Sequence, residues 1–341
     1  MIEFFAEYGL FLLKAVTIVA AIVIVVGTVA AAGRKAGMQE GLEIEHLNKK
    51  YQTLASVLKQ AVLKKADWKT HAKEEKAKAK ADAKSDDKKP RSFVIDFKGD
   101  LKATAVASLR EEVSAILEVA GPDDQVIVRL ENHGGLVHEH GLAASQLARV
   151  RDQGITLLVS VDKVAASGGY LMACVASKIY AAPFAILGSV GVIAQLPNFN
   201  RLMDEHGIDF EVITAGKYKR NVTIFGKNTD EDRKKLKEEL EDVHSLFKDA
   251  ISKYRQELDI EKIATGEHWY GTRALELGLA DELKTSDELL AELAKDRDLY
   301  RVTYKVKQPL QKRLLASVDG LLEKADAARW RHRFESRLPR S

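Results

Sequence analysis

A serine at the start of a glycine-rich helical segment is the first feature of this chain that could carry out chemistry. The segment KVAASGGYLMACVASKIYAAPFAILGSVGV (residues 163–192) passes through Ser167 into an apolar run with helical spacing. A nucleophile just before a helix gains from free backbone N–H groups and from the positive end of the helix dipole. Gly168 and Gly169 would let a substrate backbone approach closely. An ordinary N-cap serine followed by two packing glycines is the alternative.

A second glycine pair could stabilise the negative charge that such a nucleophile creates. Gly134 and Gly135 lie in LENHGGLVHEHG (residues 130–141), directly after an expected buried strand and before an expected helix. A backbone N–H group at this position can donate to a developing oxyanion. A tight turn that requires glycine explains the same residues, and the two interpretations are compatible.

Serine chemistry also needs a general base, and the sequence offers histidines and lysines. His133, His138 and His140 cluster near the second glycine pair, but their spacing is only a weak indication of a metal site without further ligands. A lysine in ITAGKYKRNV (residues 213–222) could act as the base if burial kept its amine neutral. These patterns leave both kinds of base open.

The pattern of apolar residues along the chain indicates the strands and helices that must position these groups. Alternation of strands with helix-sized spacers predicts an α/β fold with a parallel sheet and crossover helices. Thr229, with Asp232 three residues on, is close to a capping box at the start of a helix. Apolar runs predict strands at 92–101, 125–132, 156–161, 178–183 and 209–216, and helical periodicity predicts helices at 103–120, 142–153, 167–178 and 229–258.

An apolar run near the N-terminus, residues 9–33, predicts a membrane anchor. No charge occurs from Ala15 to Ala32, and a membrane-spanning helix needs about 20 mostly apolar residues. A cleavable signal peptide fits less well, because acidic residues precede the run and the run exceeds the usual h-region of roughly 7–15 residues. A buried core helix is the other alternative. Arg34 and Lys35 weakly favour a cytoplasmic location for the bulk of the chain.

A charged linker follows the anchor. Residues 40–62 have helical periodicity, whereas residues 64–89 form a Lys/Ala-rich tract that cannot bury enough apolar surface to fold alone. Acidic residues are interleaved with the lysines, which favours a solvated helix or tether over a nucleic-acid-binding patch. The net charge of +3 implies no strongly polyanionic partner, and the single cysteine, Cys174, excludes a disulfide framework within the chain.

Four motifs in this order resemble the signal peptide peptidase A family of Ser–Lys proteases over residues 92–285. They are ASGGY (166–170), GSVGV (188–192), TAGKYKRN (214–221) and GEHWYGTRALELGLADEL (266–283). The resemblance implies a ClpP/crotonase-like fold with a parallel sheet and crossover helices, preceded by an N-terminal transmembrane helix and the charged linker.

The resemblance also implies roles for individual residues. Ser167 is expected to be the nucleophile, Lys219 the general base, and Ser189 the hydroxyl that orients the lysine amine. Gly168 and Gly135 are expected to donate backbone N–H groups to the oxyanion, and no metal or cofactor is implied.

One loop departs from the pattern of the family. The family commonly has NSPGG where this chain has Glu131-Asn132-His133-Gly134-Gly135. The glycine pair persists, so a backbone donor is still expected. The histidine in this loop, His133, is the minor alternative as the base of a His-based triad.

The expected protein is a membrane-anchored serine endopeptidase that hydrolyses apolar or membrane-associated peptides, such as signal peptides or misfolded proteins. It is expected to be a homo-oligomer in the cell inner membrane that binds no nucleic acid, with a soluble domain that is periplasmic by resemblance although the flanking charges favour the cytoplasm. A catalytically inactive scaffold and a crotonase-type CoA-ester enzyme are the alternatives. The expected parts are an anchor (1–33), the linker (34–91), a peptidase domain (92–310) and a basic amphipathic tail (311–341).

Overall fold

A computed structural model describes residues 8–21, 41–82, 89–216, 218–219 and 222–306 of the chain. The chain divides into two compact units, one formed by Met1–Gly41 with Lys305–Ser341 and the other by Leu42–Tyr304. In the first unit, residues 8–21 form a helix whose apolar side chains are mostly exposed. None of the helices in the described ranges is both long enough and apolar enough to cross a membrane. The remainder of the predicted anchor, residues 22–33, and the predicted C-terminal tail lie outside the described residues.

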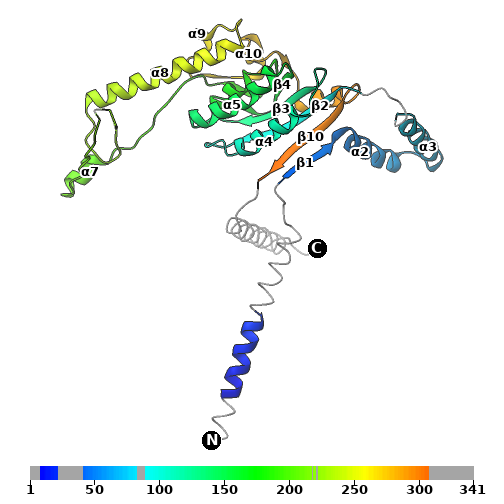
Figure 1. Cartoon of the computed structure of the whole chain (residues 1–341), viewed down its shortest axis with the longest axis horizontal. Coiled ribbons are helices and arrows are strands. Elements are labelled where there is room, and N and C mark those ends of the chain that lie inside the picture. The colour runs from blue at the N-terminus through cyan, green and yellow to red at the C-terminus, as the bar shows by residue number, and fades with distance from the viewer. Residues whose placement is uncertain (1–7, 22–40, 83–88, 217, 220–221, 307–341) are drawn as a thin grey trace, which may run out of the picture. The chain divides into compact units, whose positions relative to one another are not determined.

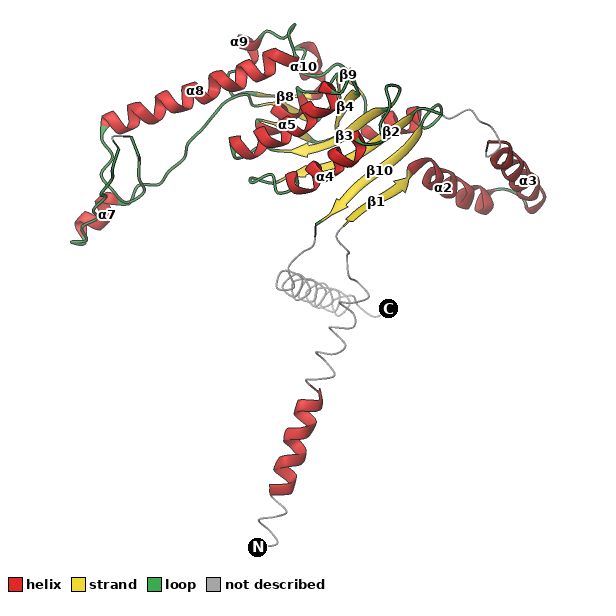
Figure 2. Cartoon of the chain, viewed as in Figure 1, coloured by secondary structure: helices red, strands yellow, loops and turns green. Residues whose placement is uncertain are grey.

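A mostly parallel sheet forms the centre of the second unit (Figure 1, Figure 2). Its main path runs in the order β1-β10-β2-β3-β4-β6-β9, and β5 and β7 extend it beside β3. The pairs that join β10 to β9 along this path are parallel, and β8 pairs with β7 antiparallel. The strands are β1 (Gly41–His46), β2 (Arg91–Gly99), β3 (Gln125–Asn132), β4 (Thr156–Val161), β5 (Val164–Ala166), β6 (Lys178–Ala181), β7 (Ile186–Gly188), β8 (His268–Tyr270), β9 (Glu282–Leu283) and β10 (Asp298–Lys305).

Helices cover the sheet and extend from it (Figure 2). The helices are α2 (Leu47–Val62), α3 (Lys65–Asp82), α4 (Val106–Leu117), α5 (Val137–Asp152), α6 (Gly168–Ala173), α7 (Asn200–Glu205), α8 (Asp230–Tyr254), α9 (Ile260–Ile263), α10 (Gly271–Glu276) and α11 (Ser286–Leu293). The capping box at the start of α8 is confirmed, because the Thr229 hydroxyl accepts the Asp232 N–H at 3.2 Å and the Asp232 carboxylate accepts the Thr229 N–H at 2.8 Å.

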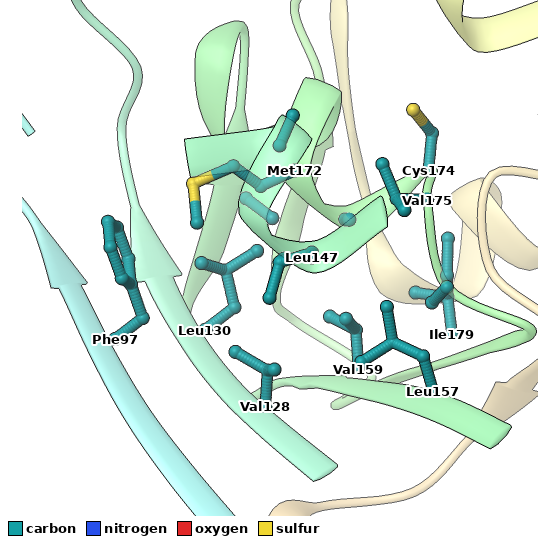
Figure 3. Close-up of a cluster of buried hydrophobic side chains, with 14 of the residues drawn as sticks. Phe97, Val128, Leu130, Leu147, Leu157, Val159, Met172, Cys174, Val175 and Ile179 are labelled. Carbon is teal, nitrogen blue, oxygen red and sulfur yellow. The ribbon is translucent and has the colours of Figure 1, made fainter. Parts of the chain in front are cut away.

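The core divides into two clusters because successive side chains of a strand point to opposite faces of a sheet. The larger cluster joins the strands to α4, α5 and α6, and Figure 3 shows Leu147 of α5 and Met172 of α6 above Val128, Leu130 and Val159. The smaller cluster lies on the alternate strand positions and is covered by α2 and α11. Its fully or nearly fully buried members include Leu47, Val94, Ile127, Leu158, Leu290 and Leu299.

Most of the predicted elements are confirmed. The strands at 125–132 and 156–161 are observed with the predicted bounds, and those at 92–101 and 178–183 appear as β2 and β6. The predicted helices at 103–120, 142–153 and 229–258 appear as α4, α5 and α8. These elements were predictable because their periodicity is local and each has one face on the core.

Two predictions about secondary structure are wrong. Residues 209–216 are not a strand: their described backbone is irregular, and the side chain of Ile213 is 93% exposed. Their alternating apolar pattern has no sheet face to pack on, and a strand away from a sheet has no hydrogen-bond partners. The helix predicted at 167–178 ends at Ala173, because a short turn must return the chain to the sheet at Lys178, the first residue of β6.

The first part of the predicted linker lies in the second unit. Leu47 at the start of α2 is buried in the smaller core cluster. Asn48 fixes this helix to the sheet, since its Nδ2 donates to the carbonyls of Ala294 and Arg297, and its Oδ1 accepts the Leu299 N–H at 2.7 Å. The Lys/Ala-rich tract is helical as far as Asp82, in α3.

Candidate active site

Ser167 has a backbone conformation that an ordinary N-cap serine does not have. It connects β5 to α6 with φ 53° and ψ −121°, and its side chain makes no capping hydrogen bond. An N-cap serine has extended dihedral angles and accepts a backbone N–H of the first turn. A non-glycine residue in such a conformation costs about 1–3 kcal/mol and persists only where the surrounding structure holds it. The ordinary N-cap interpretation is therefore excluded.

The surrounding turns hold Ser167 in place. Its N–H donates to the carbonyl of Gly188 at 2.8 Å, and its carbonyl accepts the Leu171 N–H at 3.0 Å. Ser189, directly after Gly188, also has a positive φ, of 52°, and its N–H donates to the Glu267 carbonyl. Two serines with positive φ thus lie on adjacent turns that are connected by a backbone hydrogen bond.

The register of the sheet explains why these turns meet. Asn132, the last residue of β3, pairs with Ala165, and Ala166, the last residue of β5, pairs with Gly188, the last residue of β7. The three strands are parallel neighbours, so their carboxyl ends lie at one edge of the sheet. Ligand and catalytic sites of open parallel sheets form outside the carboxyl ends of the strands.

The predicted oxyanion loop lies against the serine turn. A Cβ atom added to Gly134 would lie 2.7 Å from Ser167 Cβ and 2.8 Å from the Ala166 carbonyl oxygen, and Gly134 has a φ of +89°. Only glycine can therefore occupy this position without displacing the serine. On the other side of the loop, the Leu136 N–H donates to the Leu101 carbonyl at 2.9 Å. The structure brings together the two glycine pairs that are more than thirty residues apart in the sequence.

One N–H group of this loop is already used. Gly134 donates its N–H to Asn132 Oδ1 at 2.9 Å, so that group points into the loop itself. The next N–H along the chain belongs to Gly135, which is the donor predicted from the sequence. Gly168, the other predicted donor, is the first residue of α6, where backbone N–H groups have no partner within the helix.

Lys219, the predicted general base, is exposed on the surface of the chain. It belongs to the segment between α7 and α8, where its side chain is exposed and its backbone N–H donates to the Gly216 carbonyl at 3.2 Å. Helix α7 buries none of its side chains, and α8 buries only Phe247 and Ile251, near its C-terminal end. The start of α8 and all of α7 accordingly lie away from the sheet (Figure 1). The neighbouring Lys217 lies outside the described residues.

The three clustered histidines do not converge. His133 is exposed, the exposed ring of His138 lies 3.7 Å from Glu139, and His140 is fully buried. Within the described ranges, no three His, Cys, Asp or Glu side chains come together as a metal site would require. The burial of His140 was missed from the sequence, which placed it only in a possible metal cluster.

Cys174 does not compete with Ser167 as a nucleophile. It is buried at the end of α6, and burial raises the pKa of its thiol to about 12. The thiolate is the reactive form of cysteine, so this side chain stays unreactive near neutral pH. Cys174 is a packed residue of the larger core cluster.

Comparison with known proteins shows the family of the chain. Residues 3–147 match the family described as Peptidase family S49 N-terminal, and residues 149–300 match Peptidase family S49. The chain is 45% identical over 319 residues to the probable protease SohB of Haemophilus influenzae, covering 90% of each chain. It is 54% identical over 230 residues to the probable protease SohB of Buchnera aphidicola from Acyrthosiphon pisum, covering 67% of this chain and 68% of that one.

A more distant relative carries the name of the family inferred from the motifs. The chain is 26% identical over 181 residues to the putative signal peptide peptidase SppA of Enterococcus faecium, covering 52% of each chain. The chain belongs to peptidase family S49. The resemblance inferred from the four motifs is thereby confirmed.

Proposed function

We propose that this chain is a serine endopeptidase whose nucleophile is Ser167. The observation that carries the proposal is the strained conformation of Ser167, which lies against a loop where only glycine fits at position 134. Strain of this kind concentrates at functional sites, where it positions a side chain that ordinary backbone geometry would not present. Membership of a peptidase family supports a peptide bond as the bond that is cleaved.

The proposed reaction uses three side chains and two backbone N–H groups. Ser167 Oγ attacks the peptide carbonyl carbon while neutral Lys219 Nζ takes its proton. The Gly168 and Gly135 N–H groups stabilise the resulting oxyanion. The C–N bond then breaks, the leaving amine takes the proton from Lys219, and water repeats the sequence on the acyl-enzyme. Ser189 orients the lysine amine.

We propose that Lys219 reaches Ser167 from a second copy of the chain. A general base must lie about 3 Å from the proton it removes, and Lys219 belongs to a segment that extends away from the sheet. The described residues between 193 and 225, before, within and after α7, expose a large set of apolar side chains, which is unusual for a surface that stays in water. The set comprises Ile193, Leu196, Phe199, Leu202, Ile208, Phe210, Val212, Ile213, Tyr218, Ile224 and Phe225.

Mixing two inactive variants tests both parts of the proposal. The full-length chain, Ser167→Ala and Lys219→Ala are each assayed on an unfolded protein and on an apolar fluorogenic peptide. Each variant alone is expected to fold and to lose activity, and a mixture of the two is expected to regain part of it. An inactive mixture would place the base in the same chain as the nucleophile. Activity retained by Lys219→Ala alone would favour another base, such as His133. Activity retained by both variants would contradict the Ser–Lys dyad altogether, and a parent chain that cleaves neither substrate would favour the inactive scaffold or the CoA-ester enzyme.

We also propose that residues 9–33 anchor the peptidase to the inner membrane and that its substrates are apolar or membrane-associated peptides. The uncharged run from Ala15 to Ala32 supports the anchor. Alkaline phosphatase fused to the C-terminus is active only outside the cytoplasm. An active fusion would indicate a periplasmic domain, and an inactive but expressed fusion would indicate the cytoplasmic side that Arg34 and Lys35 favour.

A further inference from the structure

We infer that His140 is a positioning residue that connects the oxyanion loop to the nucleophile turn, an inference that rests on the proposed function. His140 lies in the first turn of α5 and is fully buried, as is Asn132 at the end of β3. Its Nε2 lies 3.2 Å from Asn132 Oδ1, and its Nδ1 lies 3.0 Å from the Leu136 carbonyl oxygen. Both partners are acceptors and a neutral imidazole has one N–H, so we take the tautomer protonated at Nε2, which donates to Asn132 Oδ1.

On one side, the ring acts through Asn132 on the oxyanion loop. Asn132 Oδ1 accepts the Gly134 N–H at 2.9 Å, so the oxygen, and not the amide nitrogen, faces His140 Nε2. The Asn132 Nδ2 in turn lies 3.3 Å from the sulfur of Met172 on α6. His140 thus holds the orientation of the amide that directs the Gly134 N–H inward and leaves the Gly135 N–H for the oxyanion.

On the other side, the ring supports the nucleophile turn directly. A Cβ atom added to Gly168 would lie 2.5 Å from His140 Cγ, 2.7 Å from its Cβ and 2.8 Å from its Cδ2, so the backbone of Gly168 lies close against this side chain. The two predicted oxyanion donors, Gly135 and Gly168, are therefore positioned by one buried side chain. A donor that stabilises a transition state must be held to within a fraction of an ångström, and supporting side chains supply that precision.

This arrangement predicts a loss of rate rather than of substrate binding. Replacing His140 with Phe keeps a ring beneath Gly168 but removes both polar contacts, which frees the Asn132 amide to rotate. Misplacement of catalytic groups by about 1 Å costs about 100-fold in rate, and the full loss of an oxyanion donor costs about 100- to 1,000-fold. We expect kcat of His140→Phe to fall about 10- to 100-fold and KM to change less than about 3-fold.

Three variants in the full-length chain test the inference, with kcat, KM and thermal unfolding measured for each. His140→Gln can still donate to Asn132 Oδ1 and is expected to recover much of the lost kcat. His138→Phe alters an exposed histidine of the same helix and is expected to behave as the parent chain. A folded His140→Phe with the kcat of the parent, or a loss of kcat that Gln does not relieve, would overturn the inference.

Two further comparisons keep the outcome decisive. If His140→Phe does not fold, the kcat of His140→Gln is compared with that of His140→Asn. The asparagine amide is one methylene shorter and cannot reach Asn132. Equal kcat values for the two variants would overturn the inference. Ser167→Ala is assayed in parallel. Activity in Ser167→Ala would refute the proposed function itself, whereas an inactive Ser167→Ala beside a fully active His140→Phe would refute only the role of His140.

Discussion

For single residues, the candidate site depends on positions where the addition of one methyl group would change the geometry. Ser167 and Ser189 have positive φ values, and Gly134 and Gly168 leave no room for a Cβ atom. Such positions store strain that the neighbouring hydrogen bonds must offset. The glycines here are therefore required by contact with the serine turn and with His140, and not only by a need for turns.

Gly134→Ala is expected to abolish most of the activity. The added methyl group would lie 2.7 Å from Ser167 Cβ on a backbone with a φ of +89°, so either the loop or the serine must move. We expect a loss of about 1–3 kcal/mol in the free energy of unfolding, from overpacking.

Gly141→Ala is the matched control, because nothing lies within 4 Å of its added Cβ in helix α5. There the change is expected to stabilise the protein by about 0.5–1 kcal/mol with activity retained. Equal effects in urea unfolding and peptidase assays would contradict this account.

At the scale of elements, helix α5 connects the core to the site. Its first turn carries His140, and the same helix buries Ala143, Leu147 and Val150 against the sheet. Figure 3 shows Leu147 between the strands and α6. The packing of α5 therefore fixes the position of the His140 ring relative to the sheet, and it also fixes the position of α6 over the strands.

Leu147→Ala is expected to destabilise the protein by about 2–5 kcal/mol, through lost burial and the cavity that remains. Leu142→Ala on the same helix is the control, since Leu142 is 40% exposed and its truncation is expected to cost less than about 1 kcal/mol. Urea unfolding of both variants measures the difference. A cost at Leu147 no greater than that at Leu142 would show that α5 is not held by this cluster.

At the scale of the whole molecule, a buried carboxyl group couples the stability of the fold to pH. Glu112 on α4 is 4% exposed and accepts the Tyr304 N–H at 2.7 Å, which joins α4 to β10. Burial, with a smaller contribution from the charge of Asp96, raises the pKa of Glu112 from 4.5 to about 7. The folded state therefore binds a proton that the unfolded state releases between about pH 4.5 and 7, and stability falls as pH rises through this range.

Glu112→Gln is expected to remove this dependence. A glutamine oxygen can still accept the Tyr304 N–H, and it carries no charge that must be buried. Near pH 5 the variant and the parent are expected to have similar free energies of unfolding, and at pH 8 the variant is expected to be more stable by about 1–3 kcal/mol. Urea unfolding at both pH values checks this, with the exposed Glu111→Gln as control. A difference between Glu112→Gln and the parent that is the same at both pH values would contradict it.

The alternation of strands and helices, the order of the four motifs and the position of Ser167 can all be read from the amino-acid sequence. These features are local: a strand or helix pattern, a capping box and a glycine turn are each specified by residues close together in the chain. The four motifs also indicated the protein family, because their order and residue types can be recognised in the sequence alone.

How these parts meet depends on contacts that form only in the folded chain. The positive φ of Ser167 depends on Gly188, and the burial of His140 depends on Asn132 and Gly168, contacts that no local pattern encodes. The same reason explains the wrong strand at 209–216, whose alternation is real but which has no sheet to join. Pairing and burial are set by residues far apart in the sequence, so they follow from the register of the sheet and not from periodicity along the chain.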